Sequence, residues 1–306
     1  MANESVGPLG IPPERLINGE TAFYTFSTLG YVPFVRNLHL SLLRYDPRLA
    51  NHLIVFCPDD ETERELRRHG MFAINCEADD LPKFAEILRP GFGKVMSYKW
   101  TLARRLHQEV PHAWWCDGDV VVNGPVLDRI VSIIQRSDAD MIMQYEWPAH
   151  DYNCGFWIAR RSDEVEGMLA DIAEYTAGGD VEDQDRFNHF HAVRDTLTIE
   201  ALDPFEFQCG NRFYYQRFVR KPDARLLHFN FSFGKSDKES LMMRHQCWYL
   251  DAPARDKAVA RARYFVAAVA LRFGIDFVGG AVGVDLPGPR ERLEMSADRV
   301  RALLRR

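Results

Sequence analysis

The stretch HAWWCDGDVVV, residues 112–122, decides the fold because an apolar run ends directly in two acids. The run is apolar on both faces, which is typical of a strand in the middle of a parallel sheet. Ligands of open α/β sheets gather at the carboxyl ends of the strands, where Asp117 and Asp119 stand. If the strand continues through Gly118, both acidic side chains point the same way, and the glycine lets a ligand approach the backbone closely.

Two neighbouring carboxylates repel each other unless a cation neutralises both of them. A hard divalent ion such as Mg²⁺ or Mn²⁺ does so with oxygen ligands. The pair Asp117 and Asp119 therefore predicts a metal site. The alternative is that both acids cap a turn, since VVNGP follows them and such acid pairs also occur by chance.

Strand-like and helix-like segments alternate before this stretch. Asp60 is predicted to cap the helix ETERELRRH, and Gly70 to end it. This alternation predicts an α/β fold built from βαβ units. The predicted strands are 21–26, 52–58, 71–76 and 112–117, and the predicted helices are 35–43, 61–69, 81–89 and 94–110.

The second half is less regular, and composition and charge change near Asp251. Strands are predicted at 140–146, 154–160, 196–202 and 225–231, and helices at 162–177, 183–193 and 237–250. We predict three parts: an arm of residues 1–20, a main domain of residues 21–250 with halves of about 21–124 and 125–250, and a helical extension of residues 251–306.

Composition excludes several classes of protein. With 306 residues, 46% of them hydrophobic, the chain can bury a large core. Its net charge of −6 and the lack of a basic stripe exclude a nucleic-acid-binding protein. The six cysteines form no CxxC pair, which favours reduced, buried thiols over disulfides or zinc.

The sequence shows no targeting signal, which predicts a cytoplasmic protein. The N-terminus has neither a basic start nor an apolar segment, so no signal peptide is expected. The most apolar stretch, from Tyr264, contains Arg272 and Asp276, which argues against a membrane span. Basic residues outnumber acidic ones after Asp251, so this tail is either a solvated helix or a peripheral contact with the inner face of an anionic membrane.

Common nucleotide and hydrolase motifs are absent from the sequence. The tripeptide Gly234-Lys-Ser resembles the end of a P-loop, but Phe229 occupies the position of the first glycine. No GxGxxG follows the first predicted strand, and neither HExxH nor GxSxG occurs.

Four segments together resemble a known family. WWCDGDVVV, NCGFWIARRS, EDQDRFN and HFNFSFGKSDKESLMMRHQCW follow one another in the order found in nucleotide-diphospho-sugar transferases, from about Phe23 to Trp248. These are GT-A-fold retaining glycosyltransferases related to plant xylosyl-, galactosyl- and arabinosyltransferases. The resemblance implies a Rossmann-like mixed sheet flanked by helices. It also implies Mn²⁺- or Mg²⁺-dependent transfer of a hexosyl or pentosyl group, with retention, from a UDP-sugar to a glycan, lipid-linked or protein acceptor.

The resemblance also assigns roles to residues. Asp117, Asp119 and His228 would hold the metal, although an isolated histidine on an apolar strand is often only a core residue. Asp183 would accept hydrogen bonds from donor-sugar hydroxyls and Gln184 would lie beside the anomeric carbon, unless the acids of this segment merely suit a helix N-terminus. Lys235 or Lys238 would neutralise the departing diphosphate, unless both lie on a solvated loop. The remaining donor-binding residues implied are Thr25, Phe26, Asp59, Lys94, Lys99, Gly118, Asn153, Gly155, Asp185 and Gly234, with a turn of the backbone expected at Asn153 and Gly155.

Two other functions remain open from the sequence. A sugar nucleotidyltransferase would also use an α/β sheet and a carboxylate-bound metal, but its Gly-rich basic signature is missing near Thr25. A catalytically silent carbohydrate-binding subunit could keep the same fold. For a retaining reaction, Glu146, Asp151 and Asp185 are the candidate nucleophiles, and a same-face displacement would need none of them.

Overall fold

The computed structural model describes residues 8–78, 80–85, 91–146, 150–179, 182–194, 196–209, 224–230 and 234–250. The chain divides into two units, Met1–Phe231 and Ser232–Arg306, which are described separately. The predicted extension of residues 251–306 and its membrane contact lie outside the described residues. No helix within the described ranges is long and apolar enough to cross a membrane.

The first unit, Met1–Phe231, is built on a mixed sheet, as predicted. All of its strands run parallel except β7, which pairs antiparallel with β4 on one side and β6 on the other. The strand β4 lies at the centre of the sheet, as expected. Of its two neighbours, β1 is parallel and β7 is antiparallel, which corrects the expectation that β4 lies within a parallel sheet. The strand order is β3 (Ala73–Asn75), β2 (Ile54–Cys57), β1 (Thr21–Phe26), β4 (His112–Cys116), β7 (Asp151–Arg160), β6 (Met141–Glu146) and β8 (Ile199–Ala201).

A second, three-stranded sheet receives the chain after the acidic turn. Its order is β5 (Val120–Val122), β10 (Leu226–His228) and β9 (Phe207–Cys209). The pairing of β5 with β10 is antiparallel, and it places Val120 opposite His228. The sequence did not predict β5 or β9, because a strand of three residues gives too short a pattern to recognise.

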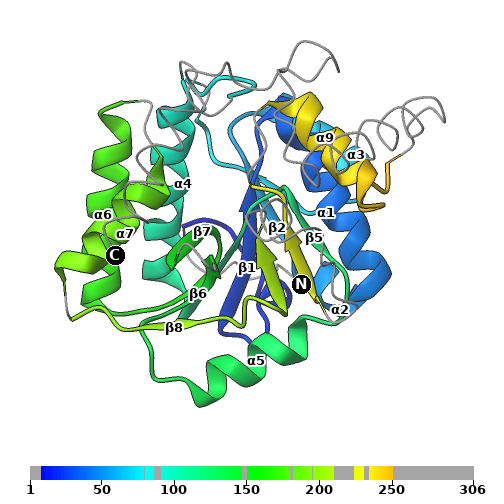
Figure 1. Cartoon of the computed structure of the whole chain (residues 1–306). Helices are drawn as coiled ribbons and strands as arrows, with labels where there is room; N and C mark the ends of the chain where they lie inside the picture. The colour runs from blue at the N-terminus through cyan, green and yellow to red at the C-terminus, as the bar shows by residue number, and fades with distance from the viewer. Residues whose placement is uncertain are drawn as a thin grey trace, which may run out of the picture. The chain divides into compact units, whose positions relative to one another are not determined.

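Helices cover both faces of the large sheet (Figure 1). One face is covered by α1 (Val32–Tyr45), α2 (Pro47–Ala50), α3 (Asp60–Arg68) and α5 (Leu127–Arg136). The other face is covered by α4 (Phe92–Glu109), α6 (Asp163–Ala177) and α7 (Asp183–Val193). Two short 3₁₀ helices, η1 (Pro13–Arg15) and η2 (Leu29–Tyr31), flank β1.

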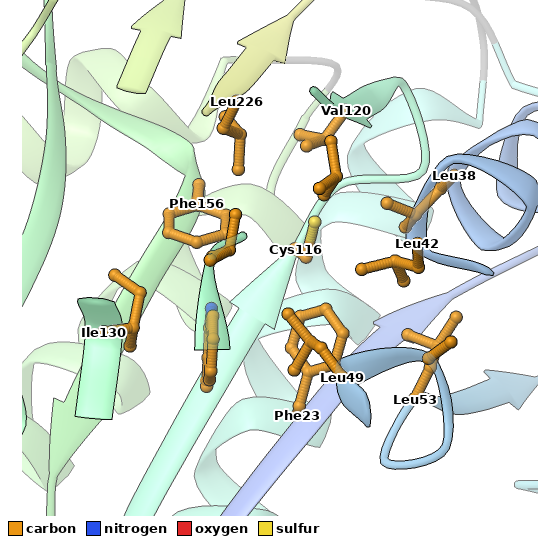
Figure 2. Packing of buried hydrophobic residues seen from close by; sticks show 14 of the residues in the cluster. Phe23, Leu38, Leu42, Leu49, Leu53, Cys116, Val120, Ile130, Phe156 and Leu226 are labelled. Atoms are coloured by element: carbon orange, nitrogen blue, oxygen red, sulfur yellow. The ribbon is translucent and has the colours of Figure 1, made fainter. Parts of the chain in front are cut away.

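The alternation of side chains along each strand divides the core into two layers. In β4, Trp114 and Cys116 face the α1 side, whereas Trp115 faces α4. Figure 2 shows Cys116 among large apolar side chains from neighbouring strands and from α1, including Phe156 and Leu42. Burial of each such side chain contributes about 1.5–3 kcal/mol, so these layers fix the central strands and the residues that follow them.

Most predicted elements of the first unit are confirmed, with two corrections. Residues 81–85 of the predicted helix 81–89 are not helical, and 86–89 lie outside the described residues. A Cβ on Gly30 would lie only 2.7 Å from the Phe84 side chain, so Phe84 packs closely against this glycine. This tertiary packing overrides the helical pattern. The cap of α3 is Asp59 rather than Asp60, because Asp59 is the extended residue whose side chain accepts from the Thr62 N–H.

The described part of the second unit contains α9 (Lys235–Arg244). The helix starts directly after Gly234, which has a φ of 82°. This is the left-handed region that favours glycine. The predicted helix 237–250 therefore begins two residues earlier than expected and ends at Arg244.

Candidate functional site

The acidic motif lies in a turn between the two sheets of the first unit. β4 ends at Cys116, and the Val120 N–H donates to the Asp117 carbonyl across the turn. The expectation that the strand continues through the motif is therefore wrong. A Cβ on Gly118 would lie 2.7 Å from Val35 Cγ2 and 3.0 Å from Tyr31, so this glycine lets the turn pack closely against α1.

Both acids nevertheless converge on one histidine. His228 Nε2 lies 3.6 Å from Asp117 Oδ2 and 3.4 Å from Asp119 Oδ1. One potential ligand atom from each of the three residues lies within 4.8 Å of the others. Asp119 and His228 are buried, and the Asp117 side chain is 29% exposed. The turn after β4 and the end of β10 thus bring together residues that are more than a hundred positions apart.

The surroundings of His228 determine which ring nitrogen can bind a metal. The Gln144 amide donates to the Phe207 carbonyl at 3.1 Å, which turns its Oε1 towards His228 Nδ1 at 3.0 Å. An amide oxygen accepts hydrogen bonds, so Nδ1 carries a proton, and in the neutral imidazole Nε2 then carries the lone pair. His228 Nε2 is buried and makes no hydrogen bond to any described residue.

This arrangement fits a divalent cation. A neutral imidazole held through its other nitrogen is the usual form of a metal-binding histidine. Asp117 Oδ2, Asp119 Oδ1 and His228 Nε2 face one another with lone pairs, and a cation would satisfy all three. The turn-capping alternative does not account for the orphaned histidine nitrogen.

Gly155 makes room for the histidine. A Cβ at this position would lie 2.0 Å from His228 Cε1 and 2.7 Å from Asp117 Oδ2. Gly155 lies inside β7, as Asn153 does, so the turn expected at these two residues is wrong. Instead, the register between β6 and β7 shifts: Met143 pairs with Trp157, but Gln144 pairs with Asn153. Within this shift, the Gly155 N–H donates to Asn153 Oδ1 at 2.8 Å.

Lys99 connects the candidate metal ligands to Asp183. Its Nζ donates to Asp183 Oδ2 at 3.0 Å and to the Cys154 carbonyl at 2.8 Å, and it lies 3.5 Å from Asp117 Oδ1. Burial alone would lower the pKa of Lys99, but the charges of Asp117 and Asp183 outweigh burial and raise this pKa above its ordinary value. Lys99 is therefore a permanent buried cation between two carboxylates.

A chain of amide and carboxylate groups extends from Asp183 along the edge of β7. Asn153 Nδ2 donates to Glu146 Oε1 at 2.7 Å and to Gln184 Oε1 at 2.9 Å. The Asn230 amide also donates to Glu146 Oε1, at 2.9 Å. Gln184, Asn153 and Glu146 thus form one polar network next to Asp183, which begins α7, and Asn153 and Glu146 are buried in it.

Five further predicted residues of the first unit lie outside this cluster of contacts. Thr25 and Phe26 are buried at the carboxyl end of β1, and Thr25 Oγ1 makes no hydrogen bond to any described residue. Asp59 caps α3. Lys94 lies on the exposed side of α4, 3.9 Å from Asp80, and Asp185 is exposed on α7. Their roles at the nucleotide stay predictions.

Three predicted residues belong to the second unit. Gly234 precedes α9, Lys235 lies 3.9 Å from Glu239 on the same helix, and Lys238 is partly buried. Their contact with a diphosphate also stays a prediction.

The sequence did not identify Gln144, Trp100 or Trp115 as parts of the site. Gln144 orients His228, and the two indole N–H groups donate to Asp183 and Asp117. A polar residue such as Gln144 within the buried segment MIMQYE is a usable signal, because a strand buries such a group only with a partner. The tryptophans look like core residues in sequence, and only their contacts reveal the indole N–H donors.

Comparisons with known proteins identify the family and the fold. The profile of the nucleotide-diphospho-sugar transferase family matches residues 48–242. The apo structure of the bifunctional glycosyltransferase WbbM aligns with a TM-score of 0.51 and 9% identity, over 75% of this chain and 48% of that one. This likeness supports the GT-A-type fold that the sequence predicts.

Other similar structures align with lower TM-scores. A glycosyltransferase involved in the glycosylation of the major capsid of PBCV-1 aligns with a TM-score of 0.45 and 12% identity, over 72% of this chain and 98% of that one. Mouse xyloside xylosyltransferase 1 aligns with a TM-score of 0.47 and 13% identity, over 70% and 99%. A search of curated proteins found no match to the sequence.

Proposed function

The chain belongs to the nucleotide-diphospho-sugar transferase family, a family of glycosyltransferases, and we propose that Asp117, Asp119 and His228 hold a divalent metal ion that binds the diphosphate of a UDP-sugar. The observation that carries this proposal is the convergence of two carboxylates on a histidine nitrogen that has a lone pair and no hydrogen bond to any described residue. Mn²⁺ suits the set better than Mg²⁺, because an imidazole ligand favours transition metals.

Charge supports the requirement for a metal. The carboxylates of Asp117 and Asp183 share the buried cation Lys99, and Asp119 adds a third negative charge beside them. A nucleoside diphosphate would add further negative charge, which this cluster repels unless a cation lies between them. Lewis-acid stabilisation of the departing diphosphate is the chemistry that a cation held there would supply.

The donor sugar would bind at Asp183 and Gln184. The Lys99 ammonium and the Trp100 indole N–H both donate to Asp183 Oδ2, which leaves Oδ1 to accept hydrogen bonds from sugar hydroxyls. Gln184 Oε1 accepts from Asn153, which leaves its amide N–H groups as donors to the sugar. Such fixed polar groups position the anomeric carbon and exclude sugars with the wrong hydroxyl pattern.

We further propose that transfer occurs with retention, by displacement on the same face of the sugar. Among the candidate nucleophiles Glu146, Asp151 and Asp185, Glu146 is buried and accepts from two side-chain amides, which makes its carboxylate a weak nucleophile. Asp185 is exposed on α7. Following the anomeric configuration of the first-formed product by NMR tests this step, and an inverted product would contradict it.

The acceptor would be a hydroxyl of a glycan, lipid-linked or protein substrate. This part of the proposal rests on the family alone. Binding to vesicles of anionic lipid would test the predicted membrane contact of the basic residues after Asp251.

The function can be tested by measuring UDP release. The protein is incubated with separate UDP-sugars and Mn²⁺, with water as the only acceptor, and then again with EDTA. We expect UDP from one donor and none with EDTA. Pyrophosphate formation from UTP and a sugar phosphate would instead indicate a nucleotidyltransferase, and sugar binding without turnover would indicate a silent subunit. Asp128→Asn, which changes an exposed acid on α5, should leave UDP release unchanged and serves as the control.

A further inference from the structure

Three tryptophans stack in a layer beneath the candidate site. Trp157 lies between Trp100, with ring centroids 5.6 Å apart and an angle of 5°, and Trp115, with centroids 6.4 Å apart and an angle of 20°. All three are almost fully buried. Closely packed side chains of this size have little freedom to move, so the layer is a rigid support for whatever it contacts.

The two outer indoles donate to different functional carboxylates. Trp115 Nε1 donates to Asp117 Oδ1 at 2.7 Å, and Trp100 Nε1 donates to Asp183 Oδ2 at 2.9 Å. The ammonium of Lys99 lies over both rings, 5.0 Å from the centroid of Trp115 and 5.3 Å from that of Trp100. The layer thus fixes both carboxylates and the cation that they share.

The hydrogen bond to Asp117 leaves the opposite oxygen free to bind a metal. Trp115 and Lys99 both contact Oδ1, whereas Oδ2 faces His228. An indole N–H is neutral, so it orients the carboxylate without cancelling its charge. A second cation in the same place would orient Asp117 as well, but it would compete with the metal for the negative charge.

We infer that Trp115 and Trp100 are positioning residues with separate tasks: the indole N–H of Trp115 aims Asp117 at the metal, and that of Trp100 aims Asp183 at the donor sugar. This inference rests on the proposed function, because it assigns the two carboxylates to metal and sugar. The central Trp157 has neither task, since its Nε1 is buried and makes no hydrogen bond to any described residue.

The layer provides its own control for a test. Trp115→Phe, Trp100→Phe and Trp157→Phe each remove similar ring area from the same stack, but only the first two remove a hydrogen bond to a carboxylate. Mn²⁺ affinity is measured by isothermal titration calorimetry in the presence of UDP. Donor recognition is measured as the ratio of the Kd values of UDP and the UDP-sugar substrate, together with the KM and kcat of each variant.

We expect Trp115→Phe to weaken Mn²⁺ binding about 10–100-fold relative to Trp157→Phe, as is typical when a partner of a metal ligand is lost. Trp100→Phe should bind Mn²⁺ as Trp157→Phe does. In Trp100→Phe, the ratio of the Kd of UDP to the Kd of the UDP-sugar should fall about tenfold, because a hydrogen bond to a charged group is removed. Its KM should therefore rise more than that of Trp115→Phe at saturating Mn²⁺.

Equal Mn²⁺ affinities of the Trp115 and Trp157 variants would overturn the inference for Trp115. Equal ratios of UDP to UDP-sugar affinity in the Trp100 and Trp157 variants would overturn it for Trp100. Failure of the wild-type protein to bind Mn²⁺ would instead reject the proposed function. If Trp115→Phe does not fold, benzothienylalanine at position 115 keeps the shape of the indole and replaces its N–H with sulfur, and the same loss of Mn²⁺ affinity is expected.

Discussion

Two pairs of acids follow buried strands of the same sheet, and they lie in different environments. Asp59 and Asp60 follow β2, and Asp117 and Asp119 follow β4. Asp59 accepts from the backbone N–H of Thr62 at 2.7 Å, and Asp60 accepts from the Asn75 amide at 2.8 Å. The first pair is thus satisfied by neutral donors at the start of a helix.

The pair after β4 faces a histidine nitrogen instead of a helix. In the neutral imidazole, with its proton on Nδ1, Nε2 of His228 presents a lone pair to Asp117 and Asp119 rather than a hydrogen. A backbone N–H and a side-chain amide satisfy the first pair, whereas the second pair faces a histidine nitrogen and could hold a cation. The comparison shows that the element facing a strand end, more than the acids themselves, distinguishes a helix cap from a candidate metal site.

The largest effect should come from exchanging one acid of the second pair for its amide. Asp119→Asn removes a metal-binding charge, and we expect Mn²⁺-dependent UDP binding to weaken more than about 100-fold, beyond the usual effect of an outer-shell partner. The melting temperature should stay near that of the wild type. Asp60→Asn makes the same chemical change after β2 and should leave calorimetric Mn²⁺ binding unchanged. Unfolding of Asp119→Asn, with no metal binding by the wild type, would favour turn capping.

A second large effect should follow from filling the space beside His228. Gly155→Ala places a methyl group 2.0 Å from the imidazole, and such overpacking costs about 1–3 kcal/mol of unfolding free energy. Displacement of His228 should also reduce Mn²⁺ affinity about tenfold or more. Urea unfolding and calorimetry measure the two effects.

Gly167→Ala provides the matched control for this change. Gly167 lies within α6, and the atom nearest to its new methyl group would be Arg194 Nη1, at 3.5 Å. Alanine is favoured over glycine inside a helix, so this variant should gain about 0.5–1 kcal/mol. If both variants had the same stability and Mn²⁺ affinity, Gly155 would not be needed to accommodate His228.

Much of this comparison could be predicted from the sequence. The apolar run before Asp117 predicted a central strand, the alternation of strands and helices predicted the α/β class, and the resemblance selected His228. The sequence placed Asp59 near the nucleotide, but it assigned the cap of the following helix to Asp60. Both neighbours are good capping residues, and the choice depends on which of them has extended backbone angles.

The rest depends on contacts between distant segments. The register shift at Met143 and Gln144 has no local sequence pattern, because it results from pairing two strands. The role of Gly155 depends on a ring that arrives from β10, and the donor role of Trp115 depends on the rotamer of a residue that looks like core. Sequence periodicity reports which side chains are buried, but not which polar atoms they present to one another.

A smaller effect should follow when the cap after β2 is removed. Asp59→Ala leaves the Thr62 N–H without its acceptor, and we expect a loss of about 1 kcal/mol of unfolding free energy. Asp59→Asn should restore most of it, since asparagine caps equally well. Mn²⁺ affinity should not change in either variant. If Asp59→Ala lowers the UDP affinity and leaves the unfolding free energy unchanged, Asp59 contacts the nucleotide, as the resemblance implies. The cap would then be dispensable for stability.

The smallest effect concerns a third acid, Asp140, which lies apart from both of these pairs. Asp140, before β6, accepts from the Thr198 N–H at 3.0 Å, from the Thr198 hydroxyl at 2.7 Å and from the Ser162 hydroxyl at 3.1 Å. Burial raises the pKa of Asp140, but these hydrogen bonds outweigh burial and lower it from its ordinary value.

A lowered pKa gives stability that is present above the ordinary pKa of about 3.9 and is lost as the pH falls through the lowered value. Because the site is largely exposed, Asp140→Asn should cost only roughly 0.5 kcal/mol at neutral pH. The difference from the wild type in urea unfolding should be constant between about pH 7 and pH 5 and should shrink below about pH 4. If this difference in unfolding free energy grew on acidification, the native state would favour the protonated carboxyl of Asp140. The hydrogen bonds from Thr198 and Ser162 would then not determine its pKa.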